Sequence, residues 1–153
     1  MKKVIIIICV FTASLNAFAQ TCEQREAKML TTMGGLSAGF MYNTYAAIGS
    51  ICDGYAHSTY AVKETNDLLQ SQEQLISNLL GQLNELLTGH MLKDKNDEDF
   101  MRSVVKTVQG LKNQALYFQD YMKNKSDLKK NAYDDQRKEN WKEISKMMGL
   151  KDE

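Results

Sequence analysis

The 153-residue chain contains no proline and only two histidines. Proline removes a backbone hydrogen bond and kinks a helix, so a chain without proline suits long uninterrupted helices. Basic and acidic residues are equal in number, at 19 each, which leaves no basic excess to hold a nucleic-acid backbone. We therefore expect a helical protein that does not bind nucleic acid.

Motifs that carry enzyme or metal chemistry are also missing. No Glu-x-x-His pair of the kind that builds metal centres in helical bundles occurs, and no glycine-rich phosphate loop follows a strand. His57 follows Cys52 by five residues, a spacing that places the two side chains on different faces of a helix. We expect no catalytic residues, no metal and no cofactor, and we expect His57 and His90 to be exposed.

The first 19 residues have the three parts of a secretory signal peptide. Lys2 and Lys3 form a basic start, residues 4–11 are apolar, and residues 17–19 (Ala-Phe-Ala) match the A-x-A cleavage pattern. The apolar run is too short to span a bilayer. Cleavage after Ala19 leaves a chain of residues 20–153 with two more acidic than basic side chains. The sequence predicts an exported protein, in the periplasm or outside a bacterial cell.

Two cysteines remain after this cleavage, because Cys9 leaves with the signal peptide. An even number of cysteines in a chain bound for an oxidising compartment predicts a disulfide, here between Cys22 and Cys52. The pattern does not distinguish a bridge within one chain from a bridge between two chains. Lipidation of Cys22 is an alternative, although residues 19–21 lack the pattern of a lipoprotein signal.

A leucine-rich stretch from Asn66 to Gly89 organises the rest of the chain. Written as heptads, Leu69, Ile76 and Leu83 occupy the a positions, and further leucines fill the d, e and g positions. This apolar face is wider than a two-stranded coiled coil needs. We expect a helix that packs against two neighbours.

Residues 29–52 contain no charged side chain. Small residues recur along this segment at helical spacing and predict close packing against a neighbouring helix; they are Gly35, Gly39, Ala46 and Gly49. Bulky residues form a second stripe; they are Met33, Phe40, Ile48, Ile51 and Tyr55. We favour a buried helix of a bundle over insertion into a membrane, because Asn43, Thr44 and several tyrosines make the segment polar for a membrane span.

A second amphipathic helix follows a loop at residues 90–98. Its apolar positions step by three and four residues; they are Phe100, Val104, Val108, Leu111, Ala115, Phe118 and Met122. Asn96 or Asp97 is the expected N-cap of this helix, and Ser126 is the expected N-cap of the next one. Gly89 and Gly149 are expected to end the helices that precede them.

The predicted fold is all-α: an elongated, coiled-coil-like antiparallel helical hairpin, or an up-down bundle of three to four helices, in a single domain of residues 20–149. We expect helices at about 22–33, 36–88, 97–122 and 126–148, with a disordered end at 150–153. Gly34 and Gly35 predict a turn that folds the first helix back and brings Cys22 near Cys52. Gly54 is the weakest point of the long helix.

Tyrosine and tryptophan side chains are the main functional signal, because large rigid amphipathic rings are favoured at interfaces. The candidate interface residues are Tyr42, Tyr45, Tyr55, Tyr60 and Trp141. We expect a non-enzymatic interaction module, a structural or adaptor subunit of a bacterial cell-envelope assembly of the secretion or conjugation type. Its partner is a protein or a second copy of the chain. Two alternatives stay open: a membrane-active protein that inserts residues 29–52, and a small-ligand carrier that uses the seam near Phe40, Tyr45 and Tyr55.

Overall fold

The structure, a computed structural model, describes the backbone of residues 2–150 and the side chains of residues 24–150. The described backbone contains no strand and forms four α-helices: α1 (Lys2–Ala56), α2 (Val62–Thr88), α3 (Lys95–Lys123) and α4 (Asp127–Met147). The chain divides into two units, Met1–Leu36 and Ser37–Glu153. The predicted all-α class is therefore confirmed, and the rest of this section concerns mainly the second unit.

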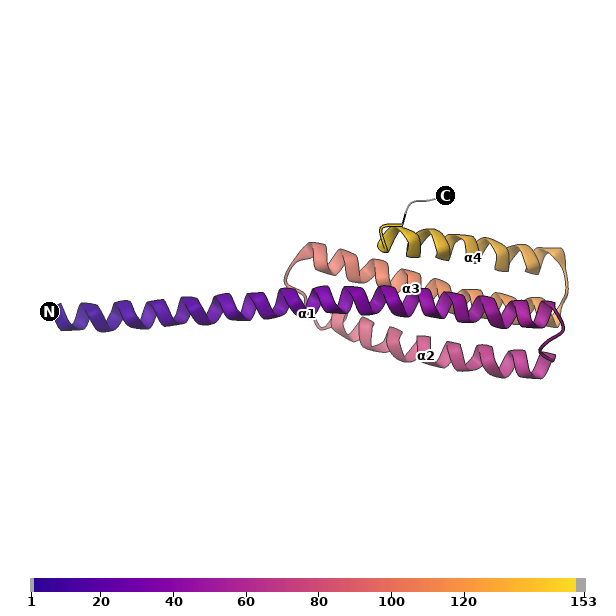
Figure 1. Ribbon diagram of the computed structural model, residues 1–153, viewed down its shortest axis with the longest axis horizontal. Helices are drawn as coiled ribbons and strands as arrows, with labels where there is room; N and C mark the ends of the chain where they lie inside the picture. The colour runs from indigo at the N-terminus through magenta and orange to yellow at the C-terminus, as the bar shows by residue number, and fades with distance from the viewer. Residues whose placement is uncertain (1, 151–153) are drawn as a thin grey trace. The chain divides into compact units, whose positions relative to one another are not determined.

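The second unit is an up-and-down bundle in which each helix runs antiparallel to the one before it (Figure 1). The part of α1 from residue 37 onward, α2, α3 and α4 are joined by short loops at residues 57–61, 89–94 and 124–126. The predicted up-down bundle is confirmed. The alternative of two long helices in one hairpin is wrong, because the expected helix at 36–88 is interrupted between α1 and α2.

α3 is the best-buried helix, and its buried side chains follow a heptad pattern that alternates steps of three and four residues. The apolar members of this row are Met101, Val104, Val108, Leu111, Ala115, Phe118 and Met122. Six of the seven predicted positions are confirmed. Phe100 is the exception: its side chain is 40% exposed, and the neighbouring Met101 takes its place in the core.

The leucine-rich stretch forms most of α2. The three predicted a positions, Leu69, Ile76 and Leu83, are all buried, together with Leu80. The predicted g-position residue Leu75 is 55% exposed. The buried face is therefore narrower than the leucine content alone predicts.

The break between α1 and α2 is a Schellman turn built around a serine. The backbone N–H of Ser58 donates to the Tyr55 carbonyl at 3.0 Å, and the N–H of Thr59 donates to the Gly54 carbonyl at 2.8 Å. Ser58 has φ 60°, the left-handed conformation that this turn requires. The ring of Tyr60 packs on Gly54 so closely that a Cβ atom at Gly54 would overlap it.

The same turn ends α2 and α4. At the end of α2 the left-handed residue is His90, with φ 49°, so the prediction that Gly89 takes this place is wrong by one residue. At the end of α4 the left-handed residue is Gly149, with φ 67°, as predicted. The N–H of Leu150 closes this last turn on the Ser145 carbonyl at 2.9 Å.

The two predicted N-caps differ in outcome. α3 begins earlier than expected, because Asp94 is its N-cap and the Asp94 carboxylate accepts a hydrogen bond from the Asn96 N–H at 2.6 Å. Neither Asn96 nor Asp97 is the cap. The predicted cap of α4, Ser126, is confirmed: its hydroxyl accepts from the Lys129 N–H at 3.4 Å.

Gly34 and Gly35 both lie inside α1, so the predicted turn at this pair is wrong. A glycine pair lowers helix propensity, but a helix continues through it when the flanking residues favour the helix. The expectation that a turn here brings Cys22 near Cys52 therefore loses its basis. The side chains of the predicted signal peptide, residues 1–19, and of Cys22 lie outside the described residues, as do residues 151–153 of the predicted disordered end.

Candidate functional site

The five predicted interface residues separate into two groups in the bundle. Tyr42 and Tyr45 on α1 meet Trp141 on α4, with ring centroids 6.4 Å and 5.5 Å from that of Trp141. Tyr55 and Tyr60 lie at the other end of the bundle part of α1, where they line a cleft. The sequence groups the five residues as one candidate interface, whereas the structure places them in two different sites.

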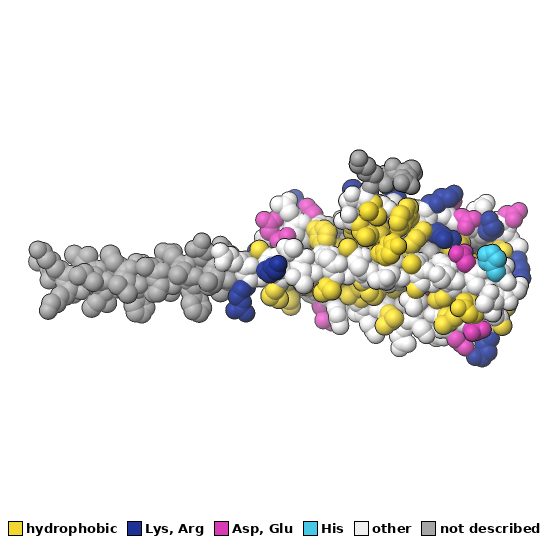
Figure 2. Space-filling view, viewed as in Figure 1, with side chains coloured by type: hydrophobic (Ala, Val, Ile, Leu, Met, Phe, Trp, Pro, Cys, Tyr) yellow, Lys and Arg dark blue, Asp and Glu magenta, His cyan; other side chains and the backbone are white. Residues whose placement is uncertain are grey.

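The first site is a surface formed by Tyr42, Tyr45 and Trp141, which we call the aromatic surface. The side chain of Tyr42 is 43% exposed and that of Trp141 is 40% exposed, whereas Tyr45 is half-buried between the helices. Figure 2 shows hydrophobic side chains gathered over α1 and the C-terminal half of α4 on this face of the bundle. Three large rings thus present a continuous, partly solvent-accessible apolar area.

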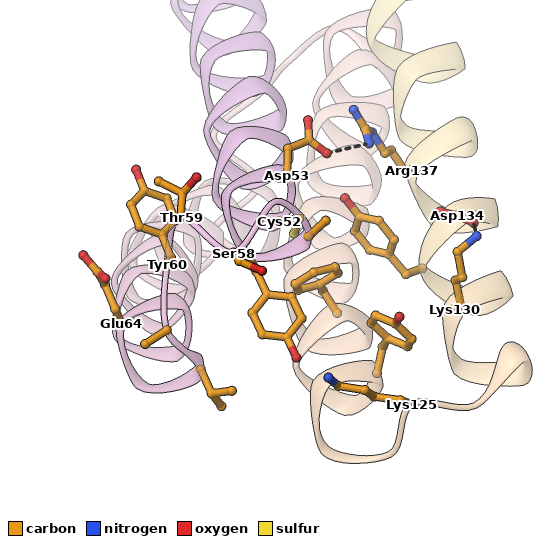
Figure 3. A pocket seen from close by; sticks show the side chains of 17 residues that line it. Cys52, Asp53, Ser58, Thr59, Tyr60, Glu64, Lys125, Lys130, Asp134 and Arg137 are labelled. Atoms are coloured by element: carbon orange, nitrogen blue, oxygen red, sulfur yellow. Dashed lines mark hydrogen bonds and ion pairs between the residues drawn. The ribbon is translucent and has the colours of Figure 1, made fainter.

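The second site is a cleft of about 940 Å³ at the end of the bundle (Figure 3). The last turn of α1, the loop at 57–61 and the start of α2 form one side of this cleft. The end of α3, the turn at 124–126 and the first half of α4 form the other side. A volume of this size is within the range of small-molecule sites.

Aromatic rings and charged groups share the lining of the cleft. Four rings of the lining form a cluster that we call the aromatic base: the Phe118 ring centroid lies 5.7 Å from that of Tyr55, 5.8 Å from that of Tyr121 and 4.9 Å from that of Tyr133. The Arg137 guanidinium is 3.8 Å from the Asp53 carboxylate. These residues come from three helices.

Sequence reasoning missed Phe118, Lys125, Lys130, Tyr133 and Arg137 as members of a site. These residues are distant from Tyr55 in the sequence. They lie near Tyr55 because α3 and α4, which run antiparallel to each other, both pack beside α1. The opposite charges of Asp53 and Arg137 are the one sequence signal that could have suggested a contact between α1 and α4. That signal is weak, because charged residues make up 25% of the sequence.

Cys52 is a buried free thiol within this lining. Burial raises the pKa of the Cys52 thiol from 9.0 to about 12, and the neighbouring Tyr133 hydroxyl lowers it by a smaller amount. Burial likewise raises the pKa of Tyr133 well above its usual value. Both groups are therefore protonated at neutral pH, and the Cys52 thiol is a poor nucleophile there because the thiolate is the reactive form.

Cys52 is a free thiol in the structure, so the predicted Cys22–Cys52 disulfide is not seen; the side chain of Cys22 lies outside the described residues. The Cys52 side chain is only 2% exposed and packs inside the bundle on the α4 side of α1, next to Tyr133. The disulfide prediction depended on the turn at Gly34 and Gly35, which α1 does not make.

The predicted stripe of small residues is mostly exposed. Gly35, Gly39 and Ala46 lie on the solvent side of α1, and a Cβ atom at Gly35 or Gly39 would meet no atom within 4 Å. Gly49 alone is buried, and a Cβ atom there would lie 3.5 Å from Nη2 of Arg137. Close helix approach instead occurs between α3 and α4. At Gly110 a Cβ atom would overlap Oδ1 of Asn140.

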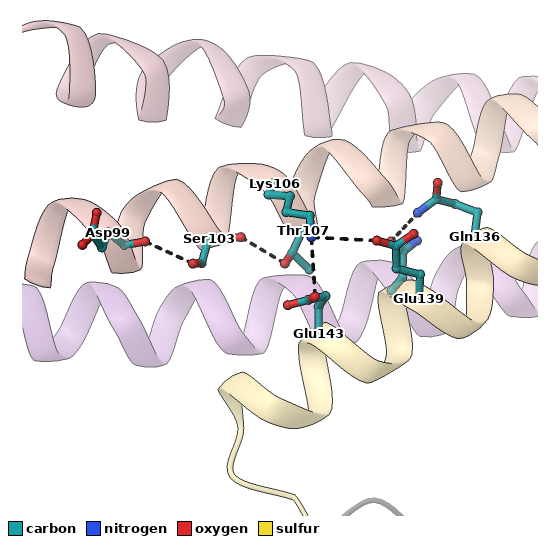
Figure 4. A network of polar contacts seen from close by, with 8 residues as sticks. Asp99, Ser103, Lys106, Thr107, Gln136, Glu139 and Glu143 are labelled. Atoms are coloured by element: carbon teal, nitrogen blue, oxygen red, sulfur yellow. Dashed lines mark hydrogen bonds and ion pairs between the residues drawn. The ribbon is translucent and has the colours of Figure 1, made fainter.

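A polar seam runs along the α3–α4 contact (Figure 4). The Asn140 amide donates to Oε1 of Gln114 at 2.9 Å and accepts from Nε2 of Gln136 at 3.0 Å. At the edge of the seam, the Lys106 ammonium lies 3.6 Å from the Glu143 carboxylate and also contacts Glu139. This seam orients α4 on α3.

The two histidines are exposed, as expected. A ring nitrogen of His57, Nδ1, lies 2.8 Å from the Asp53 carbonyl oxygen. Among the side chains of residues 24–150, no group of three histidine, cysteine or acidic residues is placed to hold a metal ion. No helix in the described part of the chain is long and apolar enough to cross a membrane.

Comparisons with known proteins return no match: no family model, no curated protein and no solved structure is similar to this chain. The functional argument therefore depends on the two sites alone.

Proposed function

We propose that this protein is an exported, non-enzymatic interaction module, a structural or adaptor subunit of a bacterial cell-envelope assembly of the secretion or conjugation type. One observation carries the proposal: Tyr42, Tyr45 and Trp141 form an aromatic surface that the bundle leaves partly exposed. Tryptophan and tyrosine supply a large share of the binding free energy at protein interfaces, because their rings bury much area with few rotatable bonds. The signal-peptide pattern of residues 1–19 supports export.

The partner chemistry follows from the make-up of this surface. Three rings beside the mixed charges of α4 suit a protein partner with an apolar centre and a polar rim, which is the usual arrangement of protein interfaces. Insertion of residues 29–52 into a membrane has less support. The apolar side chains of Met41, Ile48 and Ile51 in that segment are already buried in the bundle.

The test is chemical crosslinking in the native cell envelope, followed by mass spectrometry of the captured proteins. Tyr42→Glu places a charge on the aromatic surface. Tyr117→Glu is the matched control, because Tyr117 is a tyrosine of α3 with a similar exposure of 38% outside this surface. We expect the same envelope partner to be captured by the wild type and by Tyr117→Glu, and to be lost with Tyr42→Glu.

Two results would contradict the proposal. One is a monodisperse monomer that captures no partner in its native envelope. The other is a partner whose capture does not depend on Tyr42. Liposome flotation distinguishes the interaction module from the membrane-active alternative. An inserting protein would float with the lipid, whereas an interaction module would stay in the soluble fraction.

A further inference from the structure

The cleft at the end of the bundle is built from residues that the aromatic surface does not use. Neither Tyr42 nor Trp141 lines it, and its lining comes from all four helices of the bundle and two of the loops. The inference drawn from it is independent of the proposed function. Its features are an aromatic base, an ammonium group without an acidic partner among the described residues, and a helix end without a side-chain cap.

The aromatic base favours a planar ring. Phe118 contacts the rings of Tyr55 and Tyr133 edge-on, with interplanar angles of 88° and 62°. Edge-to-face contact is a favourable geometry for aromatic rings, and a cluster of this kind accepts a further ring in the same way. A linear or strongly polar ligand would leave this apolar base without a partner.

The cations of the cleft differ in how they are paired. Arg137 faces Asp53 at 3.8 Å, and Lys130 faces Asp134 at 3.1 Å. Lys125 has no acidic partner among the described residues; its ammonium lies 5.6 Å from the centroid of the Tyr55 ring. Figure 3 shows Lys125 at the turn between α3 and α4, with Glu64 on the opposite wall and directed away from it.

The amino end of α2 adds positive potential at the same cleft. Ala61 is the N-cap of α2, and no side chain caps the first backbone N–H groups of this helix. Ala61 and Val62 both line the cleft together with Lys125. Uncapped N–H groups and the helix dipole favour a negative group nearby.

Tyr133 adds a weakly paired hydroxyl to the lining. Its side chain is 5% exposed, and its hydroxyl interacts with the Cys52 thiol, which is a weak hydrogen-bonding group. Apart from this contact the hydroxyl has no hydrogen-bond partner among the described residues.

We infer that the cleft binds a small planar aromatic anion, with its ring on the Phe118 cluster and its carboxylate or sulfonate directed toward Lys125 and the amino end of α2. The ring contributes apolar contact and the negative group contributes orientation. Lys125 is the residue that determines the preference for an anion. The arrangement fits one small molecule for each bundle.

The test uses a fluorescent pair of probes on the purified full-length protein. 8-Anilinonaphthalene-1-sulfonate carries the ring system and the negative group, and N-phenyl-1-naphthylamine carries nearly the same rings without charge. We expect the sulfonate to bind the folded wild-type protein at one site and more tightly than the uncharged probe.

Two pairs of variants locate the binding. Lys125→Met should weaken sulfonate binding about tenfold, which is the usual effect of losing one charge-assisted contact, and should leave the uncharged probe unaffected. Lys123→Met is its control, because Lys123 is also exposed near this turn but does not line the cleft. Tyr55→Leu should weaken both probes, whereas Tyr117→Leu on the outer face of α3 should weaken neither.

The inference is overturned if the folded protein binds neither probe. It is also overturned if Lys125→Met and Lys123→Met bind the sulfonate equally, since the binding site would then lie elsewhere. Circular dichroism of each variant shows whether it is folded. If Tyr55→Leu fails to fold, Lys125→Met still decides the question, because Lys125 is exposed and its replacement removes no core contact.

Discussion

α3 contacts α2 and α4 through interfaces of different chemistry. Toward α2 the buried partner side chains are mainly aliphatic: Leu69, Ile76, Leu80 and Leu83. α4 buries only four side chains, and two of them, Asn140 and Ser145, are polar. The aliphatic contact removes apolar area from water, whereas the polar contact fixes the position of α4 through hydrogen bonds that contribute little net free energy.

The difference is sharpest in the unpaired groups. Among the described side chains, three buried polar atoms lack a hydrogen-bond partner: Nε2 of Gln114, the Tyr133 hydroxyl and Oγ of Ser145. Two of these belong to α4, and Gln114 is the residue that hydrogen-bonds to Asn140 of α4. An unpaired buried group costs free energy, so we expect α4 to be held less strongly on α3 than α2 is.

The largest effect is expected on the aliphatic side. Ile76→Ala should lower the free energy of unfolding by about 2–5 kcal/mol, because it leaves a cavity at a fully buried site. Leu75→Ala is the control, since the neighbouring Leu75 is 55% exposed and should lose far less. Urea denaturation measures both. Equal losses would contradict the packing of this face of α2 described above.

On the polar side, Gly110→Ala should lower the free energy of unfolding by about 1–3 kcal/mol. The added methyl group overlaps Oδ1 of Asn140, and the buried Asn140 side chain must shift and give up its hydrogen-bond geometry to accommodate it. Gly81→Ala, within α2 and with no atom within 4 Å, should instead stabilise the protein by about 0.5–1 kcal/mol. Thermal or urea unfolding distinguishes the two variants clearly, because their changes in the free energy of unfolding have opposite signs. Stabilisation by Gly110→Ala would mean that α3 and α4 are not in close contact there.

A double-mutant cycle can measure the interaction between Gln114 and Asn140 in the polar seam. Gln114→Leu and Asn140→Leu should each cost about 1–3 kcal/mol, because each leaves a buried amide without its partner. The double variant should lose less than the sum of the two single losses, since the Gln114–Asn140 contact is removed from both sides and only the half-buried Gln136 amide loses its acceptor. Urea unfolding of all four proteins gives the coupling energy. Additive losses would contradict a direct interaction between the two side chains.

A smaller gain is expected from the turn at the end of α1. Ser58→Gly should raise the free energy of unfolding by about 0.5–1 kcal/mol, because glycine adopts φ 60° without the cost that a side chain incurs. Ser71→Gly, inside α2, should have the opposite sign, since glycine weakens a helix interior. Thermal unfolding midpoints distinguish the two. Destabilisation by Ser58→Gly would contradict the left-handed conformation of residue 58.

The smallest effect concerns Cys52 and is zero at neutral pH. The folded-state pKa of Cys52 is about 12, above its unfolded value of 9.0. Above pH 9 the unfolded chain releases this proton while the folded chain retains it, so stability falls as the pH rises from 9 toward 12. The urea midpoint of the wild type should therefore fall more between pH 8 and pH 10 than that of Cys52→Ala. An identical fall in the two proteins would show that Cys52 is not buried.

The elements that sequence patterns predict best are those with a repeated signal. The a positions of α2 and most of the α3 row are readable because apolar residues recur every three to four positions over the whole helix. Ser126 and Gly149 are readable because their residue types are common at caps and left-handed ends. These signals are local, and they do not depend on how the helices pack.

The missed features depend on single residues in uncommon conformations or on contacts between distant segments. Ser58 and His90 are left-handed, although neither residue type signals such a turn, so the sequence indicated the end of α1 only as a weak point at Gly54. Tyr45 contacts Trp141 only because α4 lies against α1. The heptad pattern does not determine which helices are neighbours. The cleft was missed for the same reason.

The short loops of the bundle have a kinetic consequence. Because each helix packs against the one that follows it, most contacts within α2–α4 join residues close in the sequence, and domains of this kind fold in microseconds to milliseconds. With no proline in the sequence, no peptide-bond isomerisation step delays a part of the molecules. Refolding from urea should therefore be complete within one fast phase.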